Sequence, residues 1–280
     1  MEGLHPREGR ELRDCAVTSV RTVGLEGHVR ERRAQKPLLL MTHVVVGYPS
    51  LDANWTMLEA MDTAGVDLVE LQLPFSEPIA DGPSFVRANQ RALQNGTPWS
   101  AYFDLAWRAA KRVRFPLLFM GYYNSIFRMG TDGFCGRLAA AGMRGFIVGD
   151  LPPEEATELH AAARAHALDP ILLMTPTNSP GRLAEIARHA SGFVYCVARK
   201  GVTGKKTDLS QGVEGFLTRC RAATALPLAL GFGIRAPADV RALRGLADIA
   251  IVGTACLEAW EQRGPDGYRE FLTSLAEATR

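Results

Sequence analysis

The stretch LVELQLPFSEPIADGPSFVRANQRA, from Leu68 to Ala92, decides the fold. It begins with leucine and valine, becomes polar around prolines and continues as an amphipathic pattern, which predicts a strand, a loop and a helix of an α/β repeat. Glu70 lies inside the apolar strand, where a buried acid costs free energy unless it is paired or used. Asp81 precedes Gly82 and Pro83, which is ordinary turn chemistry. Glu70 is therefore the first candidate for a functional residue, and an ion-paired or rim-exposed acid is the alternative.

The same alternation continues on both sides of this stretch. Apolar segments predict eight strands, at 38–46, 68–73, 116–120, 145–148, 170–173, 192–197, 226–231 and 249–252. Amphipathic patterns predict helices at 51–64, 85–94, 101–113, 154–167, 181–189, 211–223, 237–243, 256–261 and 268–278. Near-continuous apolar strands are typical of a parallel sheet covered on both faces. Eight alternations favour a (β/α)8 TIM barrel over an open doubly wound sheet, which the pattern alone also fits.

Composition limits the classes of protein that fit. The 280 residues are 47% hydrophobic and 22% charged, with a formal net charge of +2, which favours one large domain with an extensive core. The basic residues are dispersed, so nothing points to nucleic acid. The longest mainly apolar run, at 37–46, is about ten residues and too short to cross a bilayer. Five cysteines without a CxxC pair or a neighbouring histidine predict reduced thiols in the cytoplasm and no metal site.

The first 36 residues differ from the rest of the chain. They are polar and rich in arginine and glutamate, whereas transit peptides are poor in acids. We therefore expect residues 1–36 to form a leader that runs into a short helix. Residues 37–280 are expected to form the catalytic barrel.

Glycine-rich segments follow the last three predicted strands, and they read GVTGKK, GFGI and GTA. In a TIM barrel such segments lie at the active-site end, where backbone N–H groups and a helix N-terminus favour an anion. One such loop would be ordinary turn chemistry. Three in succession predict a phosphate site that includes Gly201, Gly204, Gly231, Gly233, Gly253 and the hydroxyl of Thr254.

The motif ELxxPFSxPxADGPxxxxAxxRAL resembles the signature of the tryptophan synthase alpha chain family, which splits indole-3-glycerol phosphate into indole and glyceraldehyde 3-phosphate. The resemblance runs from about Thr42 to the C-terminus. It includes, in the family's order, MGYYN at 120–124, DLPPEE at 150–155, VYCVARKGVTG at 194–204, GFGI at 231–234 and IVGTA at 251–255.

The resemblance implies a role for each matching residue. Glu70 would be the acid–base carboxylate that protonates the indole ring carbon, and Asp81 would hold the indole nitrogen proton. Tyr195 would lie beside the reacting centre, Phe232 would pack on the indole, and Thr203 would belong to a loop that closes over the substrate. The phosphate would be bound by Gly204, Gly233, Gly253 and Thr254. No cofactor or metal is implied, and Lys200, Lys205 and Lys206 are more simply a solvated loop face than a source of a Schiff base.

Several positions depart from the family pattern. Gln72 replaces a glycine, and by strand alternation its side chain points to the same side as Glu70, where it crowds the substrate or hydrogen-bonds the glutamate. His43 and Val45 replace pocket residues that are usually phenylalanine and threonine. A neutral core histidine is the preferred interpretation of His43 over a catalytic one. Glu77 replaces an aspartate in the segment that meets the beta chain.

Three functions compete. The leading hypothesis is a lyase that acts as a tryptophan synthase alpha chain, with a pyridoxal phosphate beta chain as partner. The first alternative is a standalone lyase that releases free indole in a specialised pathway. The second is a catalytically weakened barrel that activates a beta chain, which the altered pocket at His43, Val45 and Gln72 would suggest. Both carboxylates remain in this sequence, and they favour the enzyme.

Overall fold

The structure is a computed structural model that describes residues 24–197, 211–231 and 233–280. Its strands form a closed parallel barrel in sequence order, with β1 paired to both β2 and β8. They are β1 (Leu39–Val45), β2 (Leu68–Gln72), β3 (Leu117–Gly121), β4 (Gly145–Val148), β5 (Asp169–Met174), β6 (Val194–Val197), β7 (Leu228–Gly231) and β8 (Ile249–Val252). The predicted TIM barrel is confirmed.

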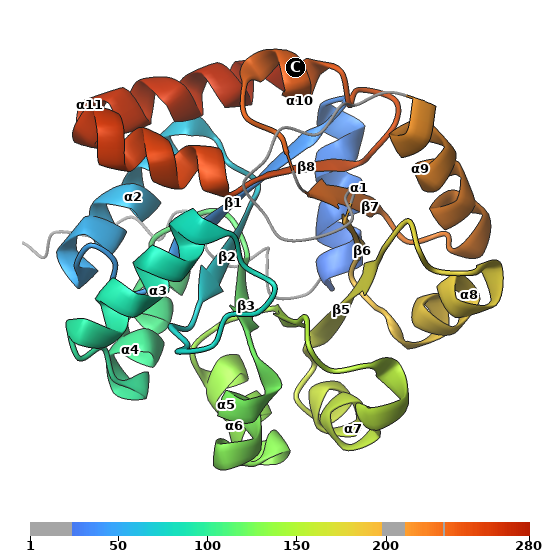
Figure 1. Ribbon diagram of the computed structural model, residues 1–280, viewed down its shortest axis with the longest axis horizontal. Coiled ribbons are helices and arrows are strands. Elements are labelled where there is room, and N and C mark those ends of the chain that lie inside the picture. The colour runs from blue at the N-terminus through green and yellow to red at the C-terminus, as the bar shows by residue number, and fades with distance from the viewer. Residues whose placement is uncertain (1–23, 198–210, 232) are drawn as a thin grey trace, which may run out of the picture.

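Helices surround the strands as a ring (Figure 1). They are α1 (Leu25–Gln35), α2 (Leu51–Ala64), α3 (Pro83–Gln94), α4 (Trp99–Ala110), α5 (Tyr123–Met129), α6 (Thr131–Ala140), the 3-10 turn η1 (Pro153–Glu155), α7 (Thr157–Ala165), α8 (Pro180–His189), α9 (Gln211–Ala223), α10 (Pro237–Arg241) and α11 (Thr254–Ala278). Ser50 and Ser179 accept hydrogen bonds from the first turns of α2 and α8, as the sequence pattern of a cap residue suggests. None of the helices in the described ranges is both long and apolar enough to cross a membrane.

Helix α1 closes the N-terminal end of the barrel and appears inside the ring in Figure 1. Its Leu25 and Val29 are buried in the cluster of inward-facing strand residues. The Leu25 N–H donates to Asp169 Oδ2 at 3.1 Å, at the start of β5. Arg32 binds the fully buried side chain of Asp67, just before β2. With this end filled, the C-terminal ends of the strands are left to form the pocket.

The segment between β3 and β4 differs from the sequence prediction, which placed no helix there. The structure has α5 and α6, joined at Gly130 with a φ of +82°. Gly133 and Gly136 lower the helix propensity of α6, and this obscures the signal. Burial of Phe134 and Leu138 in the core compensates for that weak propensity. Of the predicted leader, residues 1–23 lie outside the described residues.

Candidate active site

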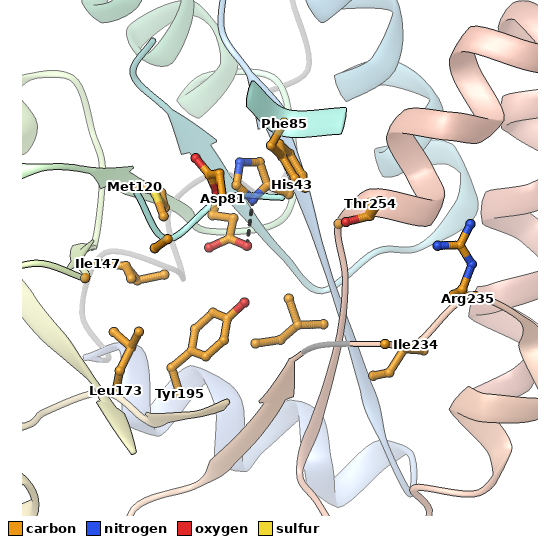
Figure 2. A pocket seen from close by; sticks show the side chains of 16 residues that line it. His43, Asp81, Phe85, Met120, Ile147, Leu173, Tyr195, Ile234, Arg235 and Thr254 are labelled. Atoms are coloured by element: carbon orange, nitrogen blue, oxygen red, sulfur yellow. Dashed lines mark hydrogen bonds and ion pairs between the residues drawn. The ribbon is translucent and has the colours of Figure 1, made fainter. Parts of the chain in front are cut away.

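A pocket of about 820 Å³, its open mouth included, lies at the C-terminal ends of the strands. Every strand, or the loop that follows it, contributes to the lining. Figure 2 shows the side chains of His43, Asp81 and Tyr195 around the same space.

Glu70 projects from β2 into this pocket, and its side chain is only 3% exposed. His43 is its partner across the β1–β2 pairing, where the two residues are in register. Glu70 Oε1 lies 3.0 Å from His43 Nδ1, which the dashed line in Figure 2 marks. Glu70, the first candidate for a functional residue, is therefore both paired and in the pocket.

Gln72 connects this pair to Asp81. Its Oε1 lies 2.8 Å from His43 Nε2, and its Nε2 donates to Asp81 Oδ2 at 2.6 Å. Gln72 is fully buried, and it points to the same side as Glu70, as strand alternation predicted. The two carboxylates are thus joined by one continuous chain of hydrogen bonds through Gln72 and His43, two of the positions that depart from the family pattern.

Tyr122 supports Asp81 from the other side. Its hydroxyl donates to Asp81 Oδ2 at 3.2 Å and accepts the N–H of Ala80 at 3.2 Å. The sequence prediction missed Tyr122, although it lies within the quoted MGYYN motif.

Burial and charge set the protonation of these groups. Burial raises the pKa of Asp81 above its usual value, and the smaller effects of His43, Gln72 and Tyr122 oppose it. Burial is the largest single effect on the pKa of His43 and lowers it, but the charge and hydrogen bond of Glu70, the charge of Asp81 and the hydrogen bond to Gln72 together exceed it, so the pKa of His43 is raised. The pKa of Tyr195 is raised by burial and by the charges of Glu70 and Asp81.

Two interpretations of β1 need correction. His43 was expected to be a neutral core histidine, but it lies in the pocket, bonded to Glu70, with a raised pKa. Val45 was expected to line the pocket. It packs instead in a separate apolar cluster with Phe85 of α3 and Leu257 of α11, because β1 ends there and helices cover it.

The side of the pocket formed by the loops after β7 and β8 carries the predicted anion-binding groups. Gly233, Gly253 and Thr254 all line it, and α11 begins at Thr254, so the positive end of its dipole faces the pocket. Gly233 has a φ of +83°, a conformation that favours glycine. Arg235 also lines this side and is ion-paired with Glu258. The sequence prediction missed Arg235, although it directly follows the GFGI motif. The predicted site residues Thr203, Gly204 and Phe232 lie outside the described residues.

Barrel and pocket together define a class of enzyme. An apolar pocket with two carboxylates from β2 and the loop after it, and an anion-binding rim from the loops after β7 and β8, fits acid–base chemistry on a small anionic substrate. No group of three or more His, Cys, Asp or Glu residues in the described part of the chain could bind a metal ion.

Comparison with known proteins identifies the family. The family model for the tryptophan synthase alpha chain matches residues 29–279. The chain is 47% identical over 251 residues to the tryptophan synthase alpha chain of Syntrophotalea carbinolica, covering 90% of this chain and 99% of that one. It is 48% identical over 252 residues to that of Desulforapulum autotrophicum, covering 90% and 100%. The chain belongs to the tryptophan synthase alpha chain family.

Solved structures agree with this assignment. A structure of Mycobacterium tuberculosis tryptophan synthase matches with a TM-score of 0.86 at 33% identity, covering 91% of this chain and 98% of that chain. The tryptophan synthase subunit alpha of Legionella pneumophila matches with a TM-score of 0.83 at 30% identity, covering 91% and 97%. The resemblance seen in the sequence is confirmed, and with it the expected class of enzyme, a lyase of tryptophan biosynthesis.

Proposed function

We propose that this chain cleaves indole-3-glycerol phosphate to indole and glyceraldehyde 3-phosphate, with residues 37–280 as the catalytic domain. The observation that carries the proposal is the placement of Glu70 and Asp81 in one pocket with Gly233, Gly253 and Thr254. The substrate has an aromatic ring at one end and a phosphate at the other. The apolar walls with their carboxylates suit the ring, and the glycine rim with the α11 N-terminus suits the phosphate.

The residues supply acid–base chemistry for a retro-aldol cleavage. Glu70 delivers a proton to the indole ring carbon that carries the glycerol chain, and positive charge develops on the ring nitrogen. Asp81 stabilises that charge by accepting the indole N–H. A base removes the proton of the adjacent hydroxyl, the carbon–carbon bond breaks, and its electrons neutralise the ring. The hydroxyl carbon becomes the aldehyde of glyceraldehyde 3-phosphate.

The test is indole release from indole-3-glycerol phosphate by the purified chain, alone and with a tryptophan synthase beta chain. We expect activity that rises when the beta chain is added. Equal, high activity in both assays would indicate the standalone lyase instead. No indole in either assay, with activation of the beta chain by this protein, would indicate the weakened barrel.

We further propose a pyridoxal phosphate beta chain as partner, docked beside the pocket. Two large apolar side chains are strongly exposed there, Ile79 at 73% and Phe127 at 72%. Ile79 is in the loop that carries Asp81, and this loop is tied to the start of α5 by the Ala80–Tyr122 hydrogen bond. Exposed apolar side chains of this size favour a protein interface. We also propose a cytoplasmic location, because the cysteines among the described residues are free thiols.

Replacing Phe127 with Asp should weaken activation by the beta chain. The change places a charge where we propose an apolar contact, so about tenfold more beta chain should be needed for half-maximal activation. The measurement is indole release against beta-chain concentration. Lys111→Ala, on the exposed end of α4, is the matched surface control. An unchanged activation curve for the Phe127 variant would place the interface elsewhere.

Replacing Gly231 with Ala should displace Tyr195. A methyl group at this position would lie 2.6 Å from Tyr195 Cε1 and 2.7 Å from its hydroxyl oxygen, both closer than atoms can pack. Because Tyr195 shares the pocket with Glu70, we expect kcat/KM for indole release to fall by about 10- to 100-fold. Steady-state kinetics measures the fall. If the clash acts by displacing the Tyr195 ring, the double variant Gly231→Ala/Tyr195→Phe should have the same kcat/KM for indole release as Gly231→Ala alone. A further fall in kcat/KM in the double variant would count against this explanation.

A further inference from the structure

We propose that Glu70 and His43 form a dyad that shares one exchangeable proton, and that Gln72 is the positioning residue that orients His43 for this. The inference rests on the proposed lyase function and adds a second residue to its acid–base group. It stands on the chain of contacts from Glu70 through His43 and Gln72 to Asp81, with distances of 3.0, 2.8 and 2.6 Å.

The direction of the hydrogen bonds begins at Asp81. A carboxylate oxygen accepts, so the Gln72 atom 2.6 Å from Asp81 Oδ2 is its amide nitrogen, which donates. The other end of the amide, Oε1, can only accept, and it faces His43 Nε2 at 2.8 Å. His43 Nε2 must therefore carry hydrogen. Asp81 thus sets the orientation of Gln72, and Gln72 sets the tautomer of His43.

Only two protonation states then satisfy the contact between His43 Nδ1 and Glu70 Oε1. A neutral His43 with hydrogen on Nε2 has a lone pair on Nδ1, so Glu70 must be protonated and donate. Alternatively His43 is an imidazolium that donates to an ionised Glu70. Both states hold one proton between the two atoms. Removing it would leave two lone pairs facing each other at 3.0 Å.

The surroundings keep this proton in place. The carboxyl groups of Glu70 and Asp81 face His43, and together with Gln72 they raise the pKa of His43 by more than burial lowers it. The phenol groups of Tyr122, beside Asp81, and Tyr195, in the pocket, both have a raised pKa and remain neutral. The Arg235 guanidinium also lines the pocket, where it is ion-paired with Glu258. The ring of His43 packs on Phe85 with centroids 4.4 Å apart, which restricts its rotation.

The dyad can supply the proton that the indole ring carbon gains and accept the proton that the glycerol hydroxyl loses. The shared proton passes through Glu70 to the indole ring carbon, which leaves the dyad able to accept one proton. The proton of the glycerol hydroxyl then returns to the dyad as the carbon–carbon bond breaks. The pair is restored in each turnover without a proton from solvent. His43 acts through Glu70, so the dyad does not require His43 to touch the substrate.

The first test uses NMR of the full chain with 15N-labelled histidine rings, and His43→Phe identifies the His43 signals. We expect hydrogen on Nε2 in the neutral form, and a titration midpoint that falls by about one pH unit or more in Glu70→Gln. Hydrogen on Nδ1 in the neutral form would overturn the proposal. A midpoint that Glu70→Gln leaves in place would also overturn it.

The second test is the pH dependence of kcat/KM for indole release. Because the dyad loses its proton as pH rises, kcat/KM should fall on the alkaline side, and His43→Phe should move this fall to lower pH. Gln72→Met, which keeps the side-chain volume, should reduce kcat by about tenfold, with a smaller change in KM. Tyr102→Phe is the matched control, because Tyr102 contacts the same strand from outside the barrel, at the Leu71 carbonyl.

The control should keep the wild-type pH profile. If the alkaline fall of kcat/KM occurs at the same pH in His43→Phe as in the wild type, the dyad is overturned, even when the variant is slower. The proposed function fails separately. A wild-type chain that releases no indole from indole-3-glycerol phosphate would refute the lyase assignment, while the NMR titration would still decide whether the proton is shared.

Discussion

Glu70→Gln should lower kcat for indole release by about 10³-fold, the scale expected when a general acid–base group is lost. Glutamine has the shape of glutamate but carries no transferable proton at working pH, so the indole ring carbon loses its proton donor. Binding should change little, because the phosphate rim formed by the loops after β7 and β8 is untouched. The measurement is kcat and KM for the purified variant beside the wild type.

Folding is the necessary control for this variant. A glutamine at position 70 can still donate to His43 Nδ1, so the buried pair keeps its hydrogen bond and thermal unfolding should remain cooperative. Glu59→Gln, the same chemical change at an exposed position on α2, should keep most of the activity. A Glu70→Gln variant that turned over like its parent would remove Glu70 from the mechanism.

The sequence predicted the barrel because its strands are buried on both faces and therefore read as short apolar runs. The predicted bounds of β4, β8, α2 and α9 agree with the structure, since turn residues bracket each element. Helices α5 and α6 were missed because Gly130 interrupts the pattern between them and Gly133 and Gly136 weaken the signal of α6, so that tertiary packing decides the conformation there. Local pattern was reliable where propensity and burial agree.

The candidate site was only partly predictable for a different reason. Strand alternation placed Glu70 and Gln72 on one side, but it cannot say that His43 lies between their side chains. That contact depends on the register of β1 against β2 and on the ring packing against Phe85, neither of which has a local sequence signal. Arg235 and Tyr122 were missed because their roles arise only where separate loops converge. Distances between residues far apart in the chain require the fold.

Asp81→Asn should have opposite effects on activity and stability. At neutral pH we expect kcat for indole release to fall strongly, while the free energy of unfolding stays equal to that of the wild type or exceeds it. Burial raises the folded-state pKa of Asp81, so the folded chain holds this proton more tightly than the unfolded chain does. Asp81 therefore stabilises the folded chain at pH values below the pKa that it has in the unfolded chain. This stabilisation is lost as the pH rises through the higher pKa that Asp81 has in the folded chain. At neutral pH the ionised carboxylate opposes folding, and asparagine removes that cost.

Asparagine keeps the local hydrogen bonds of Asp81, since its carbonyl oxygen can accept from Gln72 and Tyr122 as Oδ2 does. It cannot supply the negative charge that stabilises the developing indole cation, so kcat should fall by about 10²- to 10³-fold. Urea unfolding of wild type and variant at pH 4 and pH 7 checks the linkage, and the stability advantage of Asp81→Asn should shrink at the lower pH. A variant that is inactive and clearly less stable at pH 7 would instead assign Asp81 a structural role, because the charge itself would then be holding the loop after β2 in place.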